Sequence, residues 1–286
     1  MPIKVLMGYD GSPAANAAID VGAQLFPQAR LWAAHLWTPP FASTSMRQRL
    51  WTGAGRVDEF MAAIEREGEW EADRLTANGV TLARAAGWQA EPLVVRIFGG
   101  EGLRFAELAD KTDADLVLVG SRGLGGAPAV LGSVSDMVVH YTPRPVLVVP
   151  YPLLMADYAA LAAGPVMVGY DGSAGAQQAV ATAAELFPTR HLLLTNVEDG
   201  EDPDDGPDPP HADDARVSRL SVPRAHGTSG RAVADALAGC ARSRAAAAVV
   251  VGSRGRSAIR EILLGSVAMA TLHHAYLPII VVPAGA

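Results

Sequence analysis

The sequence has little with which to build a disulfide, a membrane helix or a secretion leader. Its 286 residues include one cysteine, Cys240, so no internal disulfide can form. No apolar run reaches the roughly 20 residues of a membrane span, since the run AAAAVVVGS ends at glycine and Arg254. An acid, Asp10, already stands among the first residues, where a leader would be apolar. We therefore expect a cytoplasmic protein with no membrane partner.

A surplus of positive charge is also missing. The chain carries 23 Lys and Arg against 30 Asp and Glu, a formal net charge of −7 at pH 7. Binding to nucleic acid rests on neutralising many phosphates, so we expect no nucleic-acid partner. Small anions that are recognised one at a time remain compatible with this charge.

What the chain does contain is an internal duplication. VLMGYDGSPAANAAIDVGAQLFP at 5–27 is matched by VMVGYDGSAGAQQAVATAAELFP at 166–188, at an offset of 161 residues (171 − 10). A second phrase, VGSRG, begins at Val119 and again at Val251, at an offset of 132 (251 − 119). A repeat of this length predicts two domains rather than a solenoid. We place them at 1–150 and 164–286, here called the first and second copy, with a linker at 151–163.

Each copy alternates short apolar runs with helical stretches. The runs are rich in β-branched residues along their whole length, a pattern typical of strands buried on both faces of a parallel sheet. We therefore predict an α/β fold of two tandem open-sheet domains, each with a five-stranded parallel sheet flanked by helices. Prolines bracket the fifth runs, RPVLVVP and LPIIVVP, which indicates edge strands.

The copies differ between their second and third strands. The first copy has an amphipathic helical stretch, VDEFMAAIEREGEWEADRLTANG, from Val57. The second copy has EDGEDPDDGPDPPHADD at 198–214, where 9 of 17 residues are acidic. Like charges without rigid spacing repel one another, so a solvated loop is favoured over a cation-binding tract.

The glycine-and-serine phrase is a candidate phosphate-binding loop. Glycines between a buried strand and a helix start let backbone N–H groups approach a phosphate, although they can equally make a tight connection. The phrase is no Walker loop, because no lysine occurs from Gly120 to Ser133 or from Gly252 to Ser266. In the second copy the spacing is G-x2-G-x9-G-[ST], made by Gly252, Gly255, Gly265 and Ser266.

This spacing, together with the aspartate of GYDGS, resembles the ATP-binding class of universal stress proteins over nearly the whole chain. The resemblance implies the adenine-nucleotide alpha-hydrolase-like, Rossmann-like sheet, with ATP, with or without Mg²⁺, at the carboxyl ends of the strands. It implies further that Asp171 lies beside the ribose and phosphates, and that the backbone near Val197 contacts adenine. The phosphates would be lined by Gly252, Gly255, Gly265 and Ser266.

The first copy departs from this pattern. Its corresponding residues are Asp10, Gly120, Gly123, Gly132 and Ser133, but only eight residues separate the last two glycines, and Pro128 is one of them. Proline removes one N–H donor from the loop. We expect a weaker site there, while the second copy has the better loop and lacks the helix beside it.

Several residues have a plainer alternative. Asp10 and Asp171 could cap the following helices instead of contacting nucleotide or Mg²⁺. Arg122 and Arg254 could neutralise phosphate or be solvated loop cations. The histidines show no metal-binding spacing, Cys240 resembles a small core residue, and no G-x-S-x-G elbow is present, so no metal site and no catalytic residue is predicted.

Three functions remain open at this point. The first is an ATP-binding stress or regulatory protein with little or no turnover. The second is a slow ATPase or nucleotidyl-transfer enzyme, and the third is an interaction module that binds no nucleotide. For assembly, the resemblance implies that the two fifth strands pair internally. A further homodimer contact would use another surface, such as the helix bearing Trp70.

Overall fold

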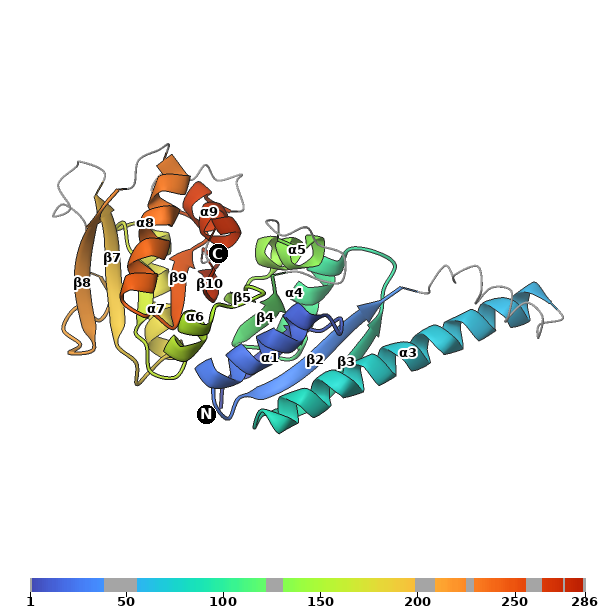
Figure 1. The fold of residues 1–286 in the computed structure, drawn as a ribbon. Helices are drawn as coiled ribbons and strands as arrows, with labels where there is room; N and C mark the ends of the chain where they lie inside the picture. The colour runs from blue at the N-terminus through green and yellow to red at the C-terminus, as the bar shows by residue number, and fades with distance from the viewer. Residues whose placement is uncertain are drawn as a thin grey trace.

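The computed structural model describes residues 2–38, 56–121, 131–198, 209–224, 229–255, 264–274 and 276–284. In the first copy, five strands alternate with helices (Figure 1). These elements are β1 (Lys4–Gly8), α1 (Pro13–Leu25), β2 (Arg30–Trp37), α3 (Val57–Ala85), β3 (Gln89–Arg96), α4 (Glu101–Lys111), β4 (Leu116–Gly120), α5 (Ser133–Tyr141) and β5 (Val146–Val149).

The second copy repeats the pattern after a short connecting helix, α6 (Met155–Ala160). Its elements are β6 (Val166–Gly169), α7 (Ala174–Leu186), β7 (Leu192–Glu198), β8 (Val217–Pro223), α8 (Ser229–Ser243), β9 (Ala248–Gly252), α9 (Ser266–His274) and β10 (Ile279–Val282). The described residues between β7 and β8, 209–216, form turns and no helix. Residues 199–208, most of the acidic loop, lie outside the described part.

All of these strands belong to one sheet, in the order β3-β2-β1-β4-β5-β10-β9-β6-β7-β8. Pairing is parallel within each copy and antiparallel only between β5 and β10, where Ile280 lies opposite Leu147. The predicted pairing of the two edge strands within one chain is therefore confirmed. Because the two halves run outward in the same strand order, they are related by a pseudo-twofold axis that passes between β5 and β10.

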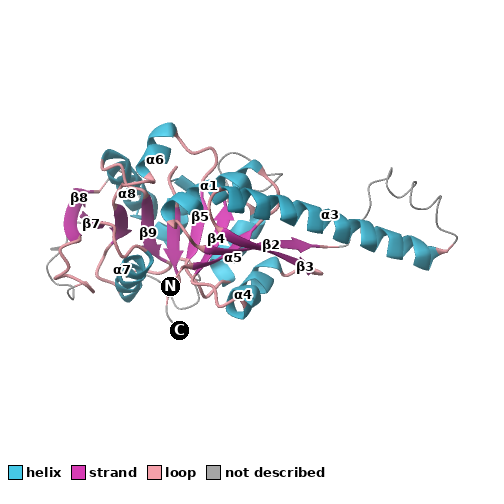
Figure 2. Ribbon diagram, turned by 90° about the horizontal axis from the view of Figure 1, so that it is seen from below, coloured by secondary structure: helices cyan, strands magenta, loops and turns pink. Residues whose placement is uncertain are grey.

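Helices cover both faces of this sheet (Figures 1 and 2). On one face, side chains of α1, α3 and α7 pack on alternate strand residues such as Val5, Met7 and Val168. On the other face, α4, α5, α8 and α9 pack on the intervening residues, among them Leu6 and Met167. Strands buried from both sides account for the continuous apolar runs in the sequence. None of the helices in the described ranges is both long and apolar enough to span a membrane.

Helix α3 is longer than the sequence pattern indicates. It continues past Gly79 to Ala85, and its first half projects beyond the sheet (Figure 1). A Cβ added at Gly79 would lie 2.8 Å from the ring of Tyr9, so this glycine lets the helix pack on the aromatic ring. Gly79, the last residue of the helical stretch expected from the sequence, therefore serves a close contact inside the helix.

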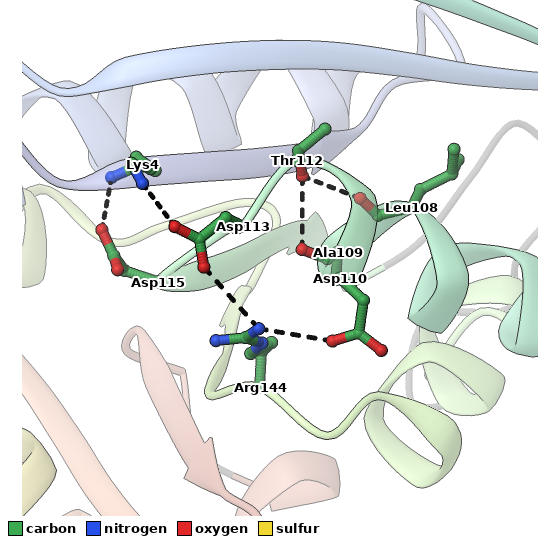
Figure 3. A network of polar contacts seen from close by, with 8 residues as sticks. All are labelled: Lys4, Leu108, Ala109, Asp110, Thr112, Asp113, Asp115 and Arg144. Atoms are coloured by element: carbon green, nitrogen blue, oxygen red, sulfur yellow. Dashed lines mark hydrogen bonds and ion pairs between the residues drawn. The ribbon is translucent and has the colours of Figure 1, made fainter.

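A network of polar contacts lies at the edge of the first copy where its parallel strands begin (Figure 3). The Lys4 backbone N–H donates to Asp115 at 2.8 Å, and its ammonium donates to Asp113 at 2.6 Å. Arg144 bridges Asp110 and Asp113, so β1, α4 and the start of β5 are joined. The hydrogen bond from Lys4 lowers the pKa of Asp113. Exposed ion pairs of this kind position elements more than they stabilise the fold.

Candidate functional site

Strands β1 and β4 are parallel neighbours in the first copy, as β6 and β9 are in the second, so the two strands of each pair end at the same edge of the sheet. Strands β1 and β4 are neighbours, but α1 lies on one face of the sheet and α5 on the other. The chain therefore leaves these strands in opposite directions, and in open α/β sheets the crevice at the carboxyl ends of the strands forms at such a point. Asp10 and Gly120 lie at this edge in the first copy, and Asp171 and Gly252 lie there in the second.

The aspartates do not cap the helices that follow them. Ser12 and Ser173 are the N-cap residues, and their hydroxyls accept from the N–H groups of Ala15 and Ala176 at 3.1 and 3.2 Å. Each aspartate instead accepts, through Oδ1, from the N–H of the serine two residues on, at 3.0 Å. The glycine between them has a φ of +74° at Gly11 and +78° at Gly172, a conformation that favours glycine. This turn holds the aspartate at the crevice and leaves the cap to serine.

In the second copy the predicted loop residues come together around Asp171. A Cβ added at Gly255 would lie 2.9 Å from Oδ2 of Asp171, so this glycine lies directly beside the carboxylate. A Cβ added at Gly265 would lie 3.8 Å from the backbone nitrogen of Gly255. Asp171, Gly255 and Gly265 therefore line one small region at the start of α9.

The first glycine of each loop has a different neighbour. A Cβ at Gly252 would lie 2.5 Å from the carbonyl oxygen of Gly175, and one at Gly120 would lie 2.8 Å from the backbone of Ala14. Both contacts are with the first turn of the helix that follows the aspartate. Gly120 and Gly252 thus allow the loop to pack on that helix, whatever the loop binds.

The last glycine of each loop closes a turn. Gly265 N–H donates to the carbonyl of Ser253 at 2.7 Å, and Gly132 N–H donates to that of Ser121 at 2.8 Å. Their N–H groups are therefore occupied. Donors for an anion come instead from the first residues of α5 and α9, because the first N–H groups of a helix have no intrahelical acceptor. Ser133 and Ser266 open these helices and are exposed.

Arg254 is not simply a solvated loop cation. Its Nε atom is buried and has no hydrogen-bond partner in the described structure. A buried donor without an acceptor is costly, so this N–H is suited to donate to an oxygen atom of a ligand. Residues 122–130 of the first-copy loop, which include Arg122, Gly123 and Pro128, lie outside the described residues.

The walls beside the two aspartates differ. In the first copy α3 packs over the turn, and a Cβ at Gly11 would lie 2.5 Å from Cδ1 of Leu75. Tyr9 is buried beneath the same helix, and its hydroxyl donates to Asn16 at 2.8 Å. Burial and the neighbouring Asp10 raise the pKa of Tyr9. In the second copy, Val197 lies at the end of β7, half-buried and paired with Val222 of β8.

The arrangement matches a known family. The model of the "Universal stress protein family" matches residues 1–150 and 163–283. Universal stress protein Rv2005c of Mycobacterium tuberculosis is 32% identical over 250 residues, which cover 76% of this chain and 79% of that protein.

A solved structure that spans nearly the whole chain agrees in fold. A universal stress protein from Archaeoglobus fulgidus DSM 4304 matches with a TM-score of 0.66 and 18% identity, covering 99% of this chain and 98% of its own. A structure of the universal stress protein from Archaeoglobus fulgidus in complex with dAMP matches 52% of this chain and 98% of its own, with 18% identity and a TM-score of 0.35.

Proposed function

Because the chain belongs to the universal stress protein family through both of its halves, we propose that it binds ATP and acts as a regulatory protein with little or no turnover. Homologues bind adenine nucleotides, cAMP in one solved complex and dAMP in another. The observation that carries the proposal is the convergence of Asp171, Gly255 and Gly265 at the start of α9. It supports a phosphate site at the crevice between β6 and β9.

Each residue then has a distinct role in the second copy. Backbone N–H groups at the start of α9 and the Ser266 hydroxyl bind phosphate oxygens, with help from the helix dipole. The guanidinium of Arg254 supplies a positive charge and an N–H that lacks an acceptor. Gly255 and Gly265 keep the space beside Asp171 free of side chains, and the backbone near Val197 contacts the base.

Asp171 fits a nucleotide that carries Mg²⁺. A carboxylate beside phosphates repels them unless a cation lies between. The described residues contain no group of three or more potential metal ligands, so the cation would be held by Asp171 together with the phosphates. In the first copy Asp10, Gly120, Gly123, Gly132 and Ser133 take the corresponding roles.

The test is calorimetric titration of the protein with ATP and MgCl2. Gly265→Ala should weaken binding about ten-fold, which corresponds to about 1.4 kcal/mol, because its methyl group would stand in the space beside Asp171 that the phosphates occupy. A Cβ at position 265 meets only ordinary contacts, the nearest at 3.4 Å, so the fold should survive. Asp171→Asn keeps the acceptor for Ser173 and removes only the charge; it should weaken binding of the Mg²⁺ complex.

Gly239→Ala is the matched control. Gly239 lies in α8, and a Cβ there would meet nothing within 4 Å. This variant should bind ATP as the unmodified protein does. Unchanged affinity in both Gly265→Ala and Asp171→Asn would refute the second-copy site. Phosphate release at tens of turnovers per second would favour an ATPase instead of a regulatory binder.

A further inference from the structure

The backbone of Arg254 lies against the first turn of α7. A Cβ added at Gly175, in that turn, would lie 2.1 Å from the carbonyl oxygen and 3.1 Å from the carbonyl carbon of Arg254. Real Cβ atoms do not come within 2.1 Å of a backbone oxygen. Any residue larger than glycine at position 175 would therefore displace Arg254.

The first copy has a side chain at the matching position. At the offset of 161, the counterpart of Gly175 is Ala14 (175 − 161). The two helices begin in the same way, since the N-caps Ser12 and Ser173 share a φ of −68° and have ψ values of 157° and 161°. The Ala14 methyl group therefore takes the space that the Arg254 carbonyl takes in the second copy. This close approach of the loop to the helix is open only to the second copy.

Ser253, the residue before Arg254, is fixed by three hydrogen bonds. Its N–H donates to the Val282 carbonyl at 2.7 Å, and its own carbonyl accepts from the Gly265 N–H at 2.7 Å. Its hydroxyl oxygen accepts from the Ala284 N–H at 2.9 Å. The residue is buried, with 6% of its surface exposed. Ser253 thus joins both ends of the loop to the segment that follows β10.

The matching serine of the first copy lacks the third of these bonds. The Ser121 N–H donates to the Val149 carbonyl at 2.7 Å, and the Ser121 carbonyl accepts from the Gly132 N–H at 2.8 Å. Its Oγ atom is buried and has no hydrogen-bond partner in the described structure. At the offset of 133, the counterpart of Ala284 is Tyr151 (284 − 133), where the chain leaves β5 for α6. The duplication therefore provides a comparison in which one serine hydroxyl accepts this bond and the other does not.

These contacts bear on the guanidinium of Arg254. The group carries a positive charge, and its Nε–H is buried without an acceptor in the described structure. Hydrogen bonds from a guanidinium to phosphate are strong and depend on direction. Holding a binding group in place before the ligand arrives reduces the freedom that is lost on binding. A backbone fixed on two sides, at Gly175 and at Ser253, provides this for Arg254.

We propose that Gly175 and Ser253 are positioning residues, which hold the backbone of Arg254 so that its guanidinium binds a phosphate of the nucleotide in the second copy. The inference rests on the proposed function. Both residues act through Arg254 and need not contact the ligand, and the first copy lacks both of these restraints.

The test for Gly175 is a double-mutant cycle, measured by calorimetry with ATP and MgCl2. The full chain carries Asp10→Asn throughout, which weakens the first-copy site. Gly175→Ala and Arg254→Gln should each weaken ATP binding about ten-fold. Adding Gly175→Ala to the Arg254→Gln protein should weaken binding by less than about two-fold, because Gly175 acts through the arginine. An equal loss in both backgrounds would mean that Gly175 has only a general structural role, and would overturn the proposal.

Ser253 is tested by two substitutions in the same Asp10→Asn chain. Ser253→Ala removes the acceptor for the Ala284 N–H and should weaken ATP binding about three- to ten-fold, the loss expected for one hydrogen bond. Ser253→Thr keeps a hydroxyl and should restore most of the affinity. The matched control is Ser121→Ala in the full chain carrying Asp171→Asn. Its Oγ atom has no partner, so ATP binding by the first copy should not change.

Circular dichroism must show that each variant is folded. Unchanged ATP affinity in a folded Gly175→Ala protein would overturn the proposal and leave ATP binding in place. If Gly175→Ala does not fold, the serine variants decide. Unchanged affinity in Ser253→Ala, an equal loss in Ser253→Thr, or an equal loss in Ser121→Ala would each overturn the proposal. Absence of ATP binding by the unmodified chain would refute the proposed function, and this inference with it.

Discussion

At the scale of single residues, the sequence predicted which residues meet but not what each one does. The spacing of Asp171, Gly255 and Gly265 indicated a common region, and the structure brings them together. The separate contribution of Gly252 could not be predicted. A glycine is needed wherever backbone atoms approach closely, and the sequence is the same whether the approaching atom belongs to a phosphate or to a helix.

The same ambiguity applied to the aspartates. Aspartate and serine are both good N-cap residues, and in DGS they stand two positions apart. The helix begins one residue after the serine in both copies, at Pro13 and Ala174, so serine is the cap. The aspartate instead accepts from the N–H of that serine, which holds it at the carboxyl end of the preceding strand.

Gly252→Ala should therefore destabilise the fold itself. Its Cβ would lie 2.5 Å from a backbone oxygen of Gly175, which cannot rotate away as a side chain can. Overpacking of this kind costs about 1–3 kcal/mol. Urea denaturation should show a lower midpoint for Gly252→Ala and little change for Gly265→Ala. Equal midpoints for the two variants would mean that Gly252 has no packing role.

At the scale of secondary structure, strong hydrophobic periodicity was sufficient to predict the long helices. A short helix without such periodicity was missed. The helical stretches expected within the duplicated segments 5–27 and 166–188 are confirmed as Pro13–Leu25 and Ala174–Leu186. Helix α6 was not predicted within the linker. It has only six residues, and its N-cap, Leu154, provides no side-chain hydrogen bond, so neither a period nor a capping residue marks it.

Helix α3 shows what the second copy has lost. It covers the turn at Gly11 and buries Tyr9, while its projecting half exposes Met61 and Trp70. A homodimer contact through this exposed apolar surface of α3 remains a prediction. The difference between the copies could be read from the sequence, because an acidic, proline-rich segment cannot replace an amphipathic helix.

The two copies should bind ATP with different affinities. The first-copy loop is one residue shorter and contains Pro128, which removes a donor. Asp171→Asn weakens the second site, so binding that remains in this protein measures the first site. Asp10→Asn weakens the first site, so binding that remains there measures the second site. We expect the Asp171→Asn protein to retain the weaker binding in calorimetry with ATP and MgCl2. Equal dissociation constants for the two variants would contradict this difference, and tighter binding by Asp171→Asn would show that the wall formed by α3 outweighs the loop.

At the scale of the whole molecule, the proline-bracketed runs predicted edge strands, and the resemblance to the family implied that these two edges pair within the chain. An unpaired apolar edge invites another strand, and a self-complementary edge pairs with its own copy. The antiparallel pair of β5 and β10 fulfils this within one chain and joins two parallel sheets into one. Spacing within a copy could not show how the helices meet at the axis, since the stacking of Phe26 on Phe187 depends on both copies at once.

Charge at this central strand pair should therefore destabilise the entire chain. Val148 and Ile280 are 2% and 0% exposed, and each lies opposite a residue of the other strand, Ile279 and Leu147. A glutamate at either position would be a buried charge without a partner, which costs several kcal/mol. We expect Val148→Glu and Ile280→Glu to lower the midpoint of urea denaturation by circular dichroism far more than Val134→Glu.

The control lies on α5, where Val134 is 41% exposed and a charge remains in water. If the two copies were independent, Ile280→Glu would unfold only the second copy, and the denaturation curve would show two steps. A paired sheet instead predicts that both copies lose stability together, because β5 loses its partner when β10 is displaced. Small-angle scattering of the unmodified chain gives an independent measure: a profile of two lobes that tumble separately would contradict a continuous sheet.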